Sequence, residues 1–190
     1  MRILMLGNSF TVANDMPDML AELTGAEVTA HTRGGARLAE HLNPKTKMGA
    51  RTQAALKTEH WDYVVLQEMS NGPVVSKEKF LQSAAALCEA IREAGAVPVF
   101  YATWAYQKGQ EKMNRFRLSY EEMYRQMTAA YQEAAQQNGA LLADVGTAFY
   151  EKSEQELLYA EDGCHPNEAG SRLAAERIAR VIWLDQQKKA

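Results

Sequence analysis

Apolar and polar positions follow two rhythms along this chain. Five short runs, most of them continuously apolar, are typical of strands with both faces covered; they span residues 2–6, 27–32, 63–67, 97–103 and 141–145. Between these runs apolar residues recur every three or four positions, which predicts helices at residues 16–23, 36–56 with a break near Asn43 and Pro44, 76–94, 119–137 and 167–186. This alternation predicts a parallel sheet with helices on both sides.

Local signals agree with these boundaries. Gly25, Gly95 and Gly139 each follow a predicted helix, where glycine accepts the left-handed conformation that ends it. Asn167, directly after Pro166, is a good N-cap for the last helix. The chain has 190 residues, 46% of them hydrophobic, without an internal repeat or a long linker. We therefore expect a single α/β domain over residues 1–190, a three-layer α/β/α sandwich with a five-stranded parallel sheet.

Charge and hydropathy exclude two classes of partner. The formal net charge is -3, and acidic and basic residues are interspersed, so no nucleic-acid-binding surface is expected. The apolar run at residues 1–7 is too short for a signal peptide or a membrane span. This predicts a cytoplasmic location and no membrane partner. The polar stretch at residues 107–117 is interpreted as a mobile loop.

The cysteines and histidines give no metal or disulfide pattern. Cys88 and Cys164 are too few for a disulfide framework and are expected to be reduced thiols. His31, His41 and His60 have no companion at ligand spacing, so we expect them on the surface, and we predict neither a metal nor a cofactor.

Polar residues and glycines follow most of the predicted strands. In open parallel sheets the loops beyond the carboxyl ends of the strands form the ligand crevice. Four such loops would meet on one rim; they carry Ser9 after the first strand, Gly35 after the second, Gln67 and Asn71 at the end of the third, and Asp162 with His165 after the fifth.

Three of these residues have the chemistry of nucleophilic catalysis. A serine hydroxyl is a poor nucleophile at neutral pH and needs a general base held by a third group. His165 could be the base for Ser9, and Asp162, three residues earlier, could orient the imidazole. The simpler interpretation is that Ser9 only caps a helix and that residues 162–166 form a polar turn. We favour catalysis because nucleophile, base and orienting group all fall on the predicted rim.

A tetrahedral intermediate would also need hydrogen-bond donors for its oxyanion. The backbone amides of Ser9 and Gly35 are candidates, together with a side-chain amide from Asn71 or Gln67. Apolar side chains could form a wall for an acyl group or a sugar; they are Trp61, Met69, Trp104 and Tyr106. Cys164 is interpreted as structural, because adjacent residues on a turn seldom aim at each other.

In these residues the chain resembles the SGNH/GDSL hydrolase superfamily, whose signature blocks contribute Ser, Gly, Asn and a final Asp-x-x-His in this order. Ser9 and Gly35 match the first two blocks, and Asp162 with His165 match the last. Counting along the third block favours Asn71 for the asparagine, but the glycine that usually precedes it is missing, so Gln67 remains the alternative. The resemblance implies a flavodoxin-like sheet of order 2-1-3-4-5 and hydrolysis of esters or carbohydrate esters.

One position next to the nucleophile departs from the family pattern. Asn8 stands where the family usually has aspartate, which removes a charge beside Ser9. The leading hypothesis is a serine esterase that forms an acyl-enzyme on Ser9, with a small-molecule ester as substrate. The acyl group is expected to be short, such as acetyl, and an acylated carbohydrate is one candidate carrier. The alternatives are a non-catalytic phosphate- or nucleotide-binding module and a pseudoenzyme that recognises acylated carbohydrate.

Overall fold

A five-stranded parallel sheet forms the centre of the computed structural model, which describes residues 1–189, the side chain of Asn114 excepted. The strands are β1 (Arg2–Gly7), β2 (Glu27–Thr32), β3 (Tyr63–Leu66), β4 (Val97–Ala102) and β5 (Leu141–Asp144). Their order is β2-β1-β3-β4-β5, and every neighbouring pair is parallel. The predicted sheet and its strand order are confirmed.

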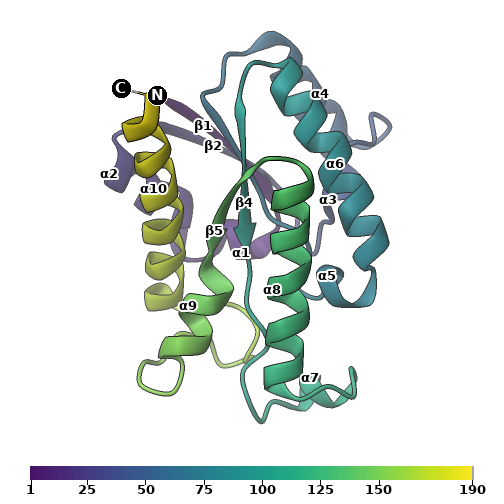
Figure 1. The fold of residues 1–190 in the computed structure, drawn as a ribbon, viewed down its shortest axis with the longest axis vertical. Helices are drawn as coiled ribbons and strands as arrows, with labels where there is room; N and C mark the ends of the chain where they lie inside the picture. The colour runs from purple at the N-terminus through teal and green to yellow at the C-terminus, as the bar shows by residue number, and fades with distance from the viewer. Residues whose placement is uncertain (190) are drawn as a thin grey trace.

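Helices cover both faces of this sheet. In Figure 1, α2 and α10 lie on one side, and α4, α6 and α8 lie on the other. The longer helices are α2 (Met16–Thr24), α4 (Lys47–Thr58), α6 (Lys77–Glu93), α8 (Tyr120–Gln137), α9 (Val145–Lys152) and α10 (Glu168–Lys189). The short ones are α1 (Ser9–Val12), the 3-10 turn η1 (Ala13–Asp15), α3 (Leu38–His41), α5 (Gly72–Val75) and α7 (Glu111–Asn114). Within residues 1–189, no helix combines the length and apolar character needed to cross a membrane.

The sequence pattern finds most of the longer helices, but it misses α9 and the short helices α1, α5 and α7. The break near Asn43 and Pro44 separates α3 from α4, and Gly25, Gly95 and Gly139 all have positive φ at helix ends. By contrast, α1, α5 and α7 have four residues each, about one turn, which is too short to show a helical period. The stretch at residues 107–117, expected to be a loop, contains α7.

Aromatic side chains fill the two sides of the core. Phe80 and Phe100 pack edge to face against Tyr131, with ring centroids 5.0 and 6.4 Å away. A separate stack runs toward the carboxyl ends of the strands: Trp104 lies 3.8 Å from Phe149 and 5.1 Å from Phe10, with nearly parallel rings. This second stack supports the rim on which the candidate site lies.

The expected surface position of two histidines is wrong. His31 is 3% exposed and His41 is 0% exposed, because α3 and α4 cover the β2 edge of the sheet. Both rings direct Nδ1 to the hydroxyl of Thr52, at 3.2 and 3.0 Å. Burial lowers the pKa of each histidine to about 4, and positive charge nearby, Arg51 for His31, adds to this. His60, in contrast, has a side chain that is 73% exposed.

These two histidines should make the protein sensitive to acid. Their folded-state pKa lies below the unfolded value of about 6.5, so the unfolded chain binds more protons as the pH falls from 6.5 toward 4. The stabilisation is complete above pH 6.5 and is lost below it. We expect the free energy of unfolding, measured in urea, to drop by about 1–2 kcal/mol per histidine between pH 7 and pH 5.

Replacing both with asparagine should remove most of this pH dependence, whatever its effect at pH 7. His60→Asn is the matched control and should leave the pH dependence as it is. The account is wrong if the double variant loses stability with acid as steeply as the parent chain.

Candidate functional site

Ser9 lies at a tight turn between β1 and α1. Asn8 caps the helix, because its Oδ1 accepts a hydrogen bond from the backbone N–H of Phe10 at 3.1 Å. Gly7 is required by close approach, since a Cβ there would overlap the hydroxyl of Thr11. The Ser9 side chain is half-buried. The turn therefore presents this hydroxyl at the rim, as predicted.

The structure brings Ser9, His165 and Asp162 together. Ser9 Oγ lies 2.9 Å from His165 Nε2, and His165 Nδ1 lies 2.8 Å from Asp162 Oδ2. Because a carboxylate only accepts hydrogen bonds, Nδ1 carries the proton and Nε2 is free to accept the proton of the serine hydroxyl. This is the geometry expected of a nucleophile, a general base and an orienting carboxylate.

Backbone hydrogen bonds shape the loop that carries His165. Asp162 Oδ1 accepts the backbone N–H groups of Cys164 and His165, at 3.0 and 2.9 Å, and Gly163 between them has φ +62. The carbonyl of Cys164 accepts a 3.0 Å hydrogen bond from Trp104 Nε1. The carboxylate thus holds its own loop as well as the imidazole.

The charge on Asp162 is well stabilised. Burial alone would raise the pKa of this carboxyl, but hydrogen bonds from the side chain and backbone of His165, from Lys112 and from Cys164 outweigh it and keep the pKa well below its usual range. Lys112 Nζ lies 2.9 Å from Asp162 Oδ2. Asp162 is therefore an anion at any pH at which His165 could act as a base.

The predicted apolar wall is only partly correct. Trp104 is 1% exposed and stacks beneath Phe10, whose ring meets the imidazole of His165 edge on at 5.1 Å. The prediction for Trp61 is wrong. It packs under the guanidinium of Arg2 at the amino end of β1, whereas Ser9 follows the carboxyl end of this strand. Tyr106 does lie at the rim that carries Ser9.

The Tyr106 hydroxyl links two of the rim loops. It lies 2.8 Å from Ser70 Oγ, and it also lies against Asn71 and the thiol of Cys164. Cys164 and Cys88 are buried free thiols, and burial raises the pKa of each to about 11. Cys164 is therefore a packed thiol, which agrees with a structural role.

The backbone amides of Ser9 and Gly35 are available as donors. Within residues 1–189, no backbone acceptor outside the helices and strands takes either N–H. Gly35 is exposed at the rim and has φ +66, a conformation that L side chains rarely adopt. Both amides are therefore open to a ligand, and their role as oxyanion donors stays a prediction.

The two candidate side-chain amides differ in their contacts. Gln67 already uses both ends of its amide. Oε1 accepts hydrogen bonds from the backbone N–H of Asn8 and the hydroxyl of Thr11, at 3.0 and 2.9 Å, and Nε2 donates to the carbonyl of Glu68. For Asn71, the hydrogen bonds found among the described residues include none donated by Nδ2, and its buried Oδ1 has no partner. Gln67 thus supports the nucleophile turn, whereas the Nδ2 of Asn71 is left as the candidate side-chain donor.

Sequence reasoning missed Glu68, which joins two rim loops. The residue is 2% exposed, and its carboxylate accepts the backbone N–H of Met69 at 2.7 Å and that of Leu38 at 3.2 Å. Gly72 packs directly on it, with room for no Cβ. Burial raises the pKa of Glu68, and the two backbone hydrogen bonds partly oppose this. The sequence did hold a signal for this role, because Glu68 is an acidic residue only two positions after the buried strand β3.

Comparison with known proteins identifies the family. The sequence model of the GDSL-like lipase/acylhydrolase family matches residues 5–173. The chain belongs to this family. It is 57% identical to a protein from Slackia heliotrinireducens assigned to the SGNH hydrolases, with a TM-score of 0.93 over 96% of this chain and 98% of that one. A comparison with curated protein sequences gives no significant match.

More distant solved structures share the fold of this GDSL-like hydrolase. The psychrotrophic esterase EstA from Pseudoalteromonas has 16% identity and a TM-score of 0.67, covering 97% of this chain and 98% of its own. Axe2, an acetylxylan esterase from Geobacillus stearothermophilus, has 15% identity and a TM-score of 0.71, covering 95% and 93%.

The structure explains why this family member has asparagine at position 8. Asn8 is 2% exposed and uses both ends of its amide: Oδ1 caps α1, and Nδ2 donates to the carbonyl of Ala36 at 3.0 Å. Ala36 directly follows Gly35, so this bond ties the nucleophile turn to the glycine loop. An aspartate at this position could cap α1, but it could not donate a hydrogen bond to the carbonyl of Ala36.

Three potential metal ligands occur in the same loop of this GDSL-like hydrolase. Donor atoms of Asp162, Cys164 and His165 lie within 4.8 Å of one another. Both imidazole nitrogens already have partners, however, and the ammonium of Lys112 lies on the carboxylate. The donors therefore fit the hydrogen-bonded arrangement with Ser9 better than a cation.

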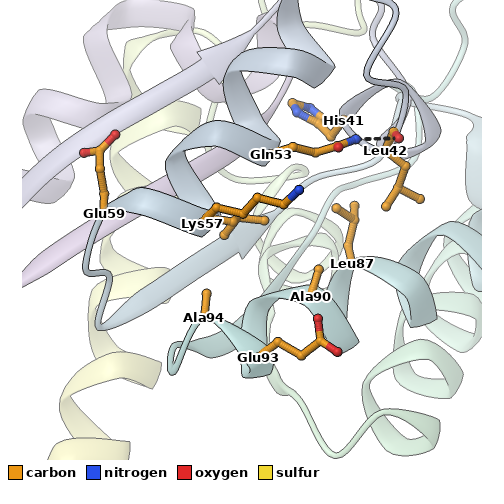
Figure 2. Close-up of a pocket in the computed structure, with 10 residues that line it drawn as sticks. His41, Leu42, Gln53, Lys57, Glu59, Leu87, Ala90, Glu93 and Ala94 are labelled. Carbon is orange, nitrogen blue, oxygen red and sulfur yellow. Dashed lines mark hydrogen bonds between the residues drawn. The ribbon is translucent and has the colours of Figure 1, made fainter.

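A hollow lies away from these residues. It measures about 650 Å³ and is formed mainly by α4 and α6, with Leu56 and Lys57 on one side and Leu87 and Glu93 on the other. Figure 2 shows Gln53 of α4 donating to the carbonyl of Leu42 at its edge. No residue of the Ser9 site lines it. Ser9 is half-buried at the rim, where Gly34 and Gly35 are exposed.

Replacing Asn8 with aspartate should destabilise this hydrolase. The carboxylate would face the carbonyl of Ala36 in a buried place without a donor between them, at a cost of about 1–3 kcal/mol in the free energy of unfolding. Urea unfolding measures this cost. Asn43→Asp is the matched control, because exposed Asn43 uses only its oxygen, toward the N–H of Lys45. Equal stability of Asn8→Asp and the parent chain would contradict the role given to Nδ2.

Proposed function

We propose that this GDSL-like hydrolase is a serine esterase that cleaves short-chain carboxylic esters through an acyl-enzyme on Ser9. The observation that carries the proposal is the 2.9 Å contact between Ser9 Oγ and His165 Nε2, two residues 156 positions apart in the chain. A helix cap or a polar turn needs no such contact. The Asp162 carboxylate on the far side of the imidazole completes the set of roles that acyl transfer requires.

The proposed reaction has two similar halves. Ser9 Oγ attacks the ester carbonyl carbon while His165 Nε2 takes the hydroxyl proton, and Asp162 stabilises the imidazolium. The carbon–oxygen bond to the alcohol then breaks, and His165 returns the proton to the leaving oxygen. Water repeats the sequence on the acyl-enzyme, giving the free acid and restoring the serine.

Donors around Ser9 would stabilise the negative oxygen of each tetrahedral intermediate. The backbone amides of Ser9 and Gly35 are unoccupied, as described above, and the side chain of Asn71 is the third donor in the proposal. Glu68 contributes indirectly, because it holds the two loops from which Gly35 and Asn71 come.

The open rim supports a small acyl group carried on a larger alcohol. A long acyl chain needs an apolar channel, whereas an acetyl group needs little more than the wall that Phe10 and Tyr106 offer. The Axe2 neighbours are named as esterases of acetylated xylan and xylooligosaccharide. We therefore propose an acetylated carbohydrate as the substrate class.

Covalent labelling tests the nucleophile directly. The protein should hydrolyse p-nitrophenyl acetate and should form a fluorophosphonate adduct at Ser9, located by peptide mass spectrometry. Ser9→Ala should abolish the adduct, and His165→Ala should lower kcat by about a thousandfold or more, because the hydroxyl loses its base. Ser83→Ala is a matched control and should retain activity, because the Ser83 hydroxyl donates to the carbonyl of Lys79 within α6, away from the rim. An unlabelled Ser9 and no turnover would favour a pseudoenzyme instead.

A second experiment should distinguish the roles of the Asn71 and Gln67 side chains. Asn71→Ala should lower kcat by about 10²–10³ with little change in KM, as expected on losing an oxyanion donor. Gln67→Ala should instead lower the melting temperature, since it strips the acceptor from Asn8 and Thr11. Kinetics and thermal unfolding of both variants check this division, and a reversed pattern would make Gln67 the donor.

A further inference from the structure

The Asp162 carboxylate receives more donors than an orienting group needs. Oδ2 accepts from His165 Nδ1 at 2.8 Å and from the ammonium of Lys112 at 2.9 Å. Oδ1 accepts the backbone N–H groups of Cys164 and His165. A full cation thus lies on the same oxygen that would stabilise the imidazolium in the proposed reaction.

Lys112 is held there by the packing of its own segment. It belongs to α7, between β4 and α8, and this segment is tied to the Asp162 loop by a 2.8 Å hydrogen bond from the N–H of Gln107 to the carbonyl of Gly163. The side chain of Gln110 packs on the same Gly163, where any Cβ would overlap it. The absence of a side chain at position 163 therefore lets α7 approach.

Two apolar side chains anchor the segment around α7. Met113 is 6% exposed, and the ring of Phe116 packs edge to face on Tyr106 with centroids 5.6 Å apart. The ion pair is thus one part of a packed interface between α7 and the His165 loop, which distinguishes it from a pair of freely moving surface side chains.

Few other titratable groups face the imidazole. The Ser9 hydroxyl lies on Nε2, and the edge of the imidazole meets the uncharged ring of Phe10. The thiol of Cys164 is next to the loop carboxylate, but burial raises its pKa to about 11, so it is neutral near pH 7. Among the described contacts of the Asp162–His165 pair, the charges are those of Asp162 and Lys112.

We propose that Lys112 is a positioning residue that acts on His165 through Asp162, reducing the negative charge at the imidazole and extending its action as a base to lower pH. The proposal rests on the proposed function of the Ser9 site. Its physical basis is that a nearby cation disfavours the protonated imidazole. Because the Lys112 side chain is 43% exposed, solvent limits the effect to about half to one pH unit.

Three variants isolate this charge. Lys112→Met keeps the apolar stem, Lys112→Arg keeps the charge, and Lys108→Met is the matched control. Lys108 lies in the same segment but pairs with Glu121, at 3.3 Å. With p-nitrophenyl acetate, the acid limb of the kcat/KM profile should move up by about half to one pH unit in Lys112→Met only. KM should stay unchanged, which a disordered site would not allow.

An NMR titration gives a readout that needs no turnover. The imidazole Cε1–H signal of His165, assigned by its absence in His165→Ala, should titrate at a higher pH in Lys112→Met than in the parent chain. Lys108→Met and Lys112→Arg should match the parent. If the signal shifts while the parent hydrolyses no ester, the proposed function fails and the inference about Lys112 stands.

Two results would overturn the inference. In one, the NMR midpoint is the same in Lys112→Met and the parent chain. In the other, Lys108→Met shifts the midpoint equally, which would mean that the effect comes from the overall net charge and not from the Lys112–Asp162 pair.

Discussion

The site depends on one contact between the two ends of the chain, because Ser9 follows the first strand and His165 precedes the last helix. Packing of α10 beside α2 brings these ends together. The turn η1 secures them: Asn14 Nδ2 donates to the carbonyl of Pro166 at 3.1 Å and to Ser171 Oγ at 2.8 Å. Asn14 and Asp15 both have positive φ, at 54° and 55°, a left-handed conformation that costs most L residues energy and that asparagine and aspartate adopt more readily than others. This local strain is offset by hydrogen bonds that fix the nucleophile turn against the loop of its proposed base.

The end of β3 organises the rest of the rim. Successive side chains of an extended chain point to opposite sides, and Gln67 and Glu68 use this alternation. Gln67 holds the turn before Ser9, whereas Glu68 holds the start of α3 and the loop before Asn71. A central strand is the most restrained part of a sheet, so donors fixed from its end move little when charge develops on a substrate. Such preorganisation is what an oxyanion site requires.

Periodicity predicted the sheet and the longer helices other than α9, because burial of a continuous face leaves a repeat in the sequence. The order of Ser9, Gly35 and the Asp162–His165 pair predicted which loops carry the candidate chemistry. Lys112 could not be predicted in this way, since its role depends on a contact between residues 50 positions apart. The burial of His31 and His41 was also missed, because their shared contact with the Thr52 hydroxyl forms only in the folded chain and leaves no pattern in the sequence.

Asn8 and Lys112 both make the site less negative in the proposed mechanism. The family pattern has an aspartate before the nucleophile, and here a neutral amide at Asn8 replaces that negative charge. Lys112 adds a positive charge on the far side of the imidazole. The developing oxyanion is negative, so removing an anion beside Ser9 favours it, and a cation near His165 favours a base that is unprotonated at lower pH. The tie from Asn8 to Ala36 means that the first of these changes is also structural, which links the electrostatics of the site to the position of the glycine loop.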